Sequence, residues 1–180
     1  MHARHEPFRT PTTIAAGAIF AALVTVATYI FIIPIPATTG YFNLGESMVY
    51  IAALVFGPFS GLIAGAGASI ADLLIPGGAA FAPATLIIKT TEGFMVGYLN
   101  KSLLKKTKST TISATTSILV GGLIMIFGYF AYEVVILGFP MTIALLEVPF
   151  NIMQMLAGLA VAVPIIHAIR RVFPQLKNHL

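Results

Sequence analysis

Positive charge is almost absent from the long apolar stretches of this sequence, and this separation leaves few folds open to the chain. Nine of the ten Lys and Arg residues lie outside these stretches, and only Lys89 lies within one. A bilayer core accommodates an apolar helix of about 20 residues, whereas the loops on its cytoplasmic side collect Lys and Arg. The sequence therefore predicts a multi-pass integral membrane protein of the cell membrane.

Composition and length favour one helical domain. Hydrophobic residues make up 58% of the chain and charged residues 9%, far outside the range of soluble proteins. A chain of 180 residues suits a single membrane domain, 1–180. We expect an all-α integral membrane protein, a compact bundle of six transmembrane helices with the N-terminus and the C-terminus inside. The expected helices are approximately 12–33, 44–57, 59–75, 84–104, 110–137 and 141–171.

The second of these helices is short, so its status decides the topology. One alternative merges 44–75 into a long helix that is broken at Gly57-Pro58, and the other places a turn there. With a turn, all three basic clusters fall on one side of the membrane. These clusters lie near the N-terminus, at 101–108 and near the C-terminus. With a merged helix, the central cluster and the C-terminus lie on opposite sides. The preference for positive charge on the cytoplasmic side therefore favours six helices.

The acidic residues have the opposite distribution, because five of the six lie in or beside apolar segments. In the six-helix topology they converge, with Lys89, on the outer half of the membrane. Ionisable groups at membrane depth are costly and usually functional. We therefore predict a pocket that opens to the outside and binds a small polar ligand with an aromatic ring. Its candidate residues are Tyr41, Asn43, Glu46, Lys89, Glu92, Tyr129, Glu133, Glu147, Asn151 and Gln154.

Three features of the sequence, the Lys89–Glu92 pair, Asp72 and Pro149, each have a second structural interpretation. Lys89 and Glu92 could form an ion pair that only fixes helix packing, and for Asp72 alone a packing role is the favoured interpretation. Pro149 could kink the last helix, or it could stand in the first turn of a helix that starts near residue 148.

The sequence offers little for catalysis. It has no cysteine, and its four histidines lie at or beyond the cytoplasmic ends of the helices. No nucleophile elbow, H-E-x-x-H sequence or aspartate-rich metal motif occurs. The net charge of +4 is explained by cytoplasmic anchoring rather than by a nucleic-acid surface. We expect no enzyme activity, no metal, no cofactor and no nucleic-acid partner.

Small residues are spaced four apart in the first helix. Ala18 and Ala22 share a face, and such spacing lets a second helix approach closely in lipid. We expect that no buried polar side chain of this helix reaches the pocket, so nothing places the alanine face on the inside of the bundle. Packing inside the bundle and an outer surface for a partner are therefore equally compatible with the pattern.

Five segments resemble a known family. They are 18–22 (AIFAA), 40–46 (GYFNLGE), 56–61 (FGPFSG), 67–73 (GASIADL) and, most specifically, 82–93 (APATLIIKTTEG). Over residues 12–170 the chain is similar to the substrate-binding S components of energy-coupling factor (ECF) vitamin transporters, in particular the riboflavin-type group.

The resemblance implies a six-helix protein that holds one vitamin in its outer half, under the loop between the first two helices. It implies a transmembrane coupling subunit and two cytoplasmic ATPase subunits as partners, with Ala18 and Ala22 in the family's docking role. The group shares a fold across unlike ligands, and we expect riboflavin, or a pyridoxine- or hydroxymethylpyrimidine-like precursor. The alternatives are a self-sufficient secondary transporter and a structural membrane protein without transport.

Overall fold

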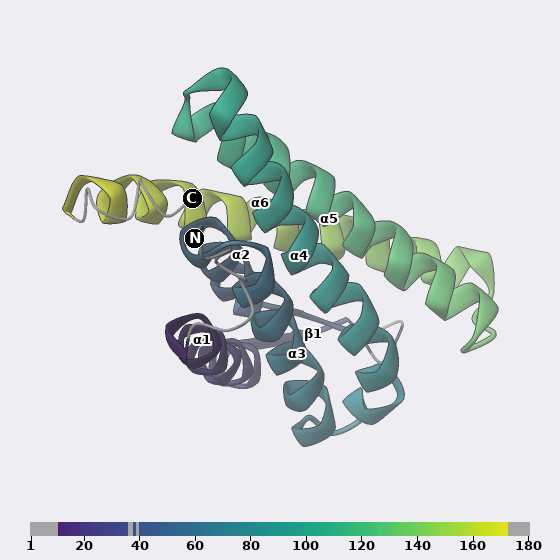
Figure 1. Cartoon of the computed structure of the whole chain (residues 1–180). Helices are drawn as coiled ribbons and strands as arrows, with labels where there is room; N and C mark the ends of the chain where they lie inside the picture. Colours follow the sequence, from purple (N-terminus) through teal and green to yellow (C-terminus); the bar gives the residue numbers. More distant parts are fainter. Residues whose placement is uncertain (1–10, 36–37, 39, 173–180) are drawn as a thin grey trace, which may run out of the picture.

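The computed structural model describes residues 11–35, 38 and 40–172, and this part of the chain forms six α-helices (Figure 1). A short hairpin of β1 (Ile32–Pro34) and β2 (Tyr41–Asn43) joins the first two helices, and a 3-10 helix, η1 (Gly78–Ala80), precedes the fourth. The all-α class with six helices is confirmed. Arg4, Arg9 and Lys177, which belong to the terminal basic clusters, lie outside the described residues. The helices are α1 (Pro11–Ile30), α2 (Gly45–Phe56), α3 (Pro58–Leu74), α4 (Ala82–Thr107), α5 (Thr110–Val135) and α6 (Met141–Val172).

Helix α2 lies inside the bundle, which explains its length. Its 12 residues span about 18 Å, too little to cross a bilayer core of about 30 Å. Ten of them are buried, and the helix packs on α1, α3, α4 and α6. Because its neighbours are protein rather than lipid, α2 does not need the length of a membrane span. By length and composition, α5 and α6 are the two described helices that are clearly able to cross a membrane.

The chain breaks between α2 and α3 at Gly57. This residue has φ of +89°, a conformation that glycine adopts without steric cost, and Pro58 begins the next helix. Glu46 at the start of α2 and Asp72 near the end of α3 line the same cavity, so the two helices run in opposite directions. The alternative of one merged helix over 44–75 is therefore wrong.

Glycines let α3 approach its neighbours to backbone contact. A Cβ atom on Gly61 would meet the carbonyl group of Gly93 in α4, and one on Gly65 would meet the carbonyl group of Lys89. On another face of α3, a Cβ atom on Gly67 would meet the backbone of Ala21 in α1. Figure 1 shows α3 lying between α1 and α4. This close packing fixes where Lys89 enters the interior.

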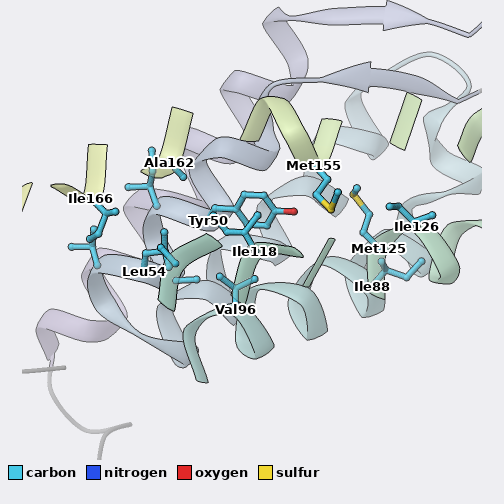
Figure 2. Packing of buried hydrophobic residues seen from close by; sticks show 14 of the residues in the cluster. Tyr50, Leu54, Ile88, Val96, Ile118, Met125, Ile126, Met155, Ala162 and Ile166 are labelled. Carbon is cyan, nitrogen blue, oxygen red and sulfur yellow. The ribbon is translucent and has the colours of Figure 1, made fainter. Parts of the chain in front are cut away.

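The apolar core lies around Tyr50 of α2, which is fully buried (Figure 2). Leu54 and Ile118 pack on one part of its ring, and the phenol oxygen points toward Met125 and Met155. The core therefore joins residues of α2, α4, α5 and α6, and the polarisable sulfur atom of Met125 contacts the ammonium group of the buried Lys89.

Helix α6 runs without interruption from Met141 to Val172, with Pro149 inside it. The alternative of a helix that starts near residue 148 is therefore wrong. Glu147, Asn151 and Gln154 follow one another at helical spacing, and all three are buried. The polar face of α6 thus looks into the bundle.

The two ends of α4 provide a test of the expected membrane orientation. The helix has 26 residues and spans about 39 Å, with η1 before it and the lysine cluster in and after its last turns. We predict that a cysteine at Thr107 reacts with an impermeant maleimide only from the cytoplasmic side, because basic residues stay inside. A cysteine at Ala79 should react on intact cells. Both positions are exposed and the chain has no native cysteine, so labelling of both from one side would contradict this topology.

Candidate ligand-binding site

A polar cavity lies where the hairpin meets the ends of the helices. Its interior volume is about 40 Å³, and about 520 Å³ of space lies within it when the open mouth is counted. Every helix contributes to the wall. The wall residues are Thr28, Gly40, Tyr41, Asn43, Gly45, Glu46, Val49, Ala68, Asp72, Phe81, Thr85, Lys89, Tyr129, Glu147, Asn151 and Gln154.

Eight of the ten candidate residues from the sequence line this cavity. They are Tyr41, Asn43, Glu46, Lys89, Tyr129, Glu147, Asn151 and Gln154. The other two, Glu92 and Glu133, are fully buried and do not reach the wall. Contact of any of these residues with a ligand stays a prediction.

Lys89 is the centre of a buried ion cluster. Its ammonium group donates to Glu46 Oε2 and, at 3.0 Å, to Glu92 Oε2, and it also contacts the sulfur atom of Met125. The ring of Tyr129 lies 5.8 Å from Nζ, within reach of a cation–π interaction. Lys89 is only 3% exposed. An ammonium group has three N–H donors, so these three partners use them all.

Glu92 supports this cluster from the core side. Its Oε1 atom accepts a hydrogen bond of 2.8 Å from the hydroxyl group of Tyr50. The sequence placed Lys89 and Glu92 together, and the structure adds Glu46 as a second partner from α2. The cluster therefore ties α4 to α2 and holds the Glu46 side chain at the cavity wall.

Asn43 connects the hairpin to three helices. Its backbone N–H and its Nδ2 group donate to Gln154 Oε1 at 3.0 and 3.2 Å. Its Oδ1 atom accepts from the backbone N–H of Gly45 at 2.9 Å and from the hydroxyl group of Thr28 at 3.4 Å. Gln154 Nε2 in turn donates to Glu46 Oε2 at 3.2 Å. The hairpin is thus joined by hydrogen bonds to the ion cluster.

Asp72 lines the cavity wall, and the packing role that the sequence favoured stays a prediction. Its Oδ1 atom accepts a hydrogen bond from the hydroxyl group of Tyr41 in β2. Burial, and then the neighbouring Asp72 carboxylate, raise the pKa of the Tyr41 phenol well above its usual value. Tyr41 therefore remains a hydrogen-bond donor at neutral pH. This contact ties the hairpin to α3.

Gly40 leaves room for Glu147. A Cβ atom at position 40 would overlap the carboxyl group of Glu147, so a larger residue would displace this side chain or the hairpin. The carboxyl group of Glu133 lies close enough to Glu147 to interact with it electrostatically. Glu133 is thus a neighbour of a wall residue rather than part of the wall.

Sequence reasoning missed several wall residues. Thr85 lies one turn before Lys89, and its hydroxyl group is 3.0 Å from that of Tyr129, so helical spacing alone was a usable signal. Phe81 and Ala68 carried no signal, because apolar residues are ordinary in such a chain. Among the residues that the structure describes, no group of three or more His, Asp or Glu is placed to hold a metal ion.

Helix α1 has two distinct faces. Thr28 is 2% exposed and lines the cavity, so the expectation that no buried polar group of this helix reaches the pocket is wrong. Val24, one turn earlier, is fully buried. Ala18 and Ala22 are exposed on the surface of the protein. The pair is therefore not used for packing within the described part of the chain.

The comparisons with known proteins concern the family and the fold. A family model described as the ECF-type riboflavin transporter, S component, matches residues 9–171. The chain belongs to this family. A solved S component of a bacterial ECF transporter superposes with a TM-score of 0.62 over 92% of this chain and 98% of that chain, at 21% identity, and so shares the fold. An uncharacterized protein from Pyrococcus woesei is 39% identical over 116 residues, which are 64% of this chain and 74% of the relative.

We predict that Lys89→Met lowers the free energy of unfolding of this S component by about 3–5 kcal/mol, because Glu46 and Glu92 lose their counter-charge. Adding Glu92→Gln should recover most of this loss, measured as thermal unfolding in detergent. Glu92→Gln alone is the matched control. An unchanged unfolding temperature in Lys89→Met would show that the cluster does not hold the fold. If Lys89 also touches the ligand, the double variant should bind it about 1.5–3 kcal/mol more weakly than the control.

Proposed function

We propose that this S component captures a small vitamin or vitamin precursor at the outer face of the cell membrane and delivers it for ATP-driven uptake. The observation that carries the proposal is the cavity beneath the hairpin, where polar side chains from all six helices converge. A concave site with a few placed polar groups beside aromatic surfaces suits one small ring compound.

The wall favours a heteroaromatic ligand with polar substituents. The chain has no Trp, so contact with the face of a ring falls to Tyr41, Phe81 and Tyr129. The side chains of Asn151 and Gln154 supply amide groups for hydrogen bonds. Riboflavin and the more compact pyridoxine- or hydroxymethylpyrimidine-like compounds have this chemistry.

The hairpin acts as the lid in this proposal. It is held to α3 through Tyr41 and Asp72, and to α6 through Asn43 and Gln154. In this proposal, these hydrogen bonds at the cavity mouth break and re-form as a ligand enters and leaves. The lid thereby couples occupation of the cavity to the position of the hairpin.

We further propose that α1 docks on a transmembrane coupling subunit, which is driven by two cytoplasmic ATPase subunits. The exposed Ala18 and Ala22 let a partner helix approach closely in lipid. This face is separate from the buried face that carries Val24 and Thr28. Docking and ligand binding therefore use opposite sides of one helix.

The double variant Ala18→Leu, Ala22→Leu tests the docking role. We predict that it reduces vitamin uptake by the assembled transporter at least about tenfold, because the bulky side chains separate the helices. Ligand binding to the isolated protein should stay unchanged. The matched control is Ala131→Leu with Ala160→Leu, which enlarges two exposed alanines of α5 and α6. Normal uptake by the α1 variant would contradict the docking role.

Identification of the bound compound tests the function itself. We predict that the protein, purified in mild detergent from cells grown in rich medium, carries a stoichiometric vitamin or precursor that mass spectrometry detects after denaturation. Glu46→Gln combined with Gln154→Ala should lose the compound, because both side chains line the cavity. A protein that carries no small molecule and binds no vitamin added to it would contradict the proposal.

A further inference from the structure

Three carboxyl groups of the cavity wall each have an oxygen atom without a hydrogen-bond partner among the residues that the structure describes. These atoms are Glu46 Oε1, Asp72 Oδ2 and Glu147 Oε1. The three residues are 2%, 4% and 4% exposed, so water reaches them poorly. A buried acceptor without a donor destabilises the protein, and the cost is larger when the acceptor is charged. The wall therefore presents hydrogen-bond acceptors that the described protein groups do not pair with donors.

The donors of the wall are largely used by the protein itself. Lys89, the only Lys or Arg among the described wall residues, is bound to Glu46 and Glu92. Gln154 Nε2 donates to Glu46, and Asn43 Nδ2 donates to Gln154. The hydroxyl group of Tyr41 donates to Asp72. A ligand consequently meets more free acceptors than free donors.

The distribution of charge around the cavity also favours a ligand that is rich in hydrogen-bond donors. The wall has three carboxyl groups and one ammonium group. Two further carboxyl groups, those of Glu92 and Glu133, lie behind the wall, next to Lys89 and Glu147 respectively. A negatively charged ligand would add to this excess in a medium of low dielectric constant, where repulsion is strong. A positively charged or donor-rich ligand would reduce it.

We propose that the ligand of this cavity is a planar heteroaromatic compound that carries an amino group or a protonated ring nitrogen, and that phosphorylated forms are excluded. The inference rests on the proposed function, because it concerns the substrate of the same site. It narrows the expected vitamins and precursors to aminopyrimidine- and aminomethylpyridine-like compounds. Their N–H groups donate to the free oxygen atoms of Glu46, Asp72 and Glu147.

Matched ligand pairs test the inference on the full-length protein in detergent after its bound compound has been removed. One pair is pyridoxamine and pyridoxine, and the other is 4-amino-5-hydroxymethyl-2-methylpyrimidine and its 4-hydroxy counterpart. Each pair differs in one amino or hydroxyl group. We expect isothermal titration calorimetry to give at least about tenfold tighter binding of the amino member in at least one pair. Pyridoxamine 5′-phosphate and riboflavin complete the panel, and the phosphate should not bind.

Single neutral variants locate the interaction. We expect at least one of Glu46→Gln, Asp72→Asn and Glu147→Gln to reduce the preference for the amino member to about threefold or less. Affinity for the hydroxyl member, measured on the same sample, shows that the variant is folded. The control is Glu133→Gln, which removes a buried carboxyl group outside the wall and should keep the preference. An unchanged preference in all three wall variants would overturn the inference.

The outcomes separate this inference from the function on which it rests. Equal or tighter binding of the hydroxyl members, binding of the phosphate, or binding of riboflavin alone would overturn the amino-group inference and leave vitamin capture standing. Failure of every compound in the panel, in a protein that nevertheless co-purifies with another vitamin, would also overturn only the inference. A protein that carries and binds nothing would overturn both.

Discussion

The ammonium group of Lys89 stands between the carboxylates of Glu46 and Glu92, and much of the arrangement depends on this contact. A lone charge at this depth would be costly, whereas two carboxylates and a polarisable sulfur atom stabilise it. The cluster joins α2 to α4 and orients Glu46 toward the cavity. Because Gln154 also donates to Glu46, and Asn43 to Gln154, the same contact reaches the hairpin at the mouth.

Backbone packing brings Lys89 to this place. Gly65 of α3 lies against the carbonyl group of Lys89, and Gly61 lies against that of Gly93, so α3 and α4 approach without intervening side chains. Such contact is a source of helix association in lipid, where apolar side chains gain little by leaving their surroundings. The wall is built on these two helices and the enclosed α2, together with residues of α1, α5, α6 and the hairpin. The close packing of these helices therefore fixes the positions of the polar groups.

Much of the fold could be predicted from the sequence. The exclusion of Lys and Arg from apolar stretches gives the membrane class, and the turn at Gly57-Pro58 gives six helices rather than five. Helical spacing places Lys89 with Glu92 and Glu147 with Asn151 and Gln154, because residues three or four apart share a face. The course of α6 through Pro149 could not be decided, because a proline is tolerated both within a membrane helix and in a first turn.

The sequence by itself determined the class, the number of helices and most of the candidate polar residues, since hydropathy and helical periodicity are local properties of the chain. Tertiary structure alone decided which of these residues meet. It added Glu46 to the Lys89 pair, brought Asp72 and Thr28 into the wall, and left Glu133 behind it. The contacts of Glu46 join residues that are 43 positions apart in the pair with Lys89 and 108 positions apart in the pair with Gln154. The distances between these residues depend on how closely the helices pack. Glycines at the helix contacts permit close packing, but the sequence does not say which helix lies against each glycine.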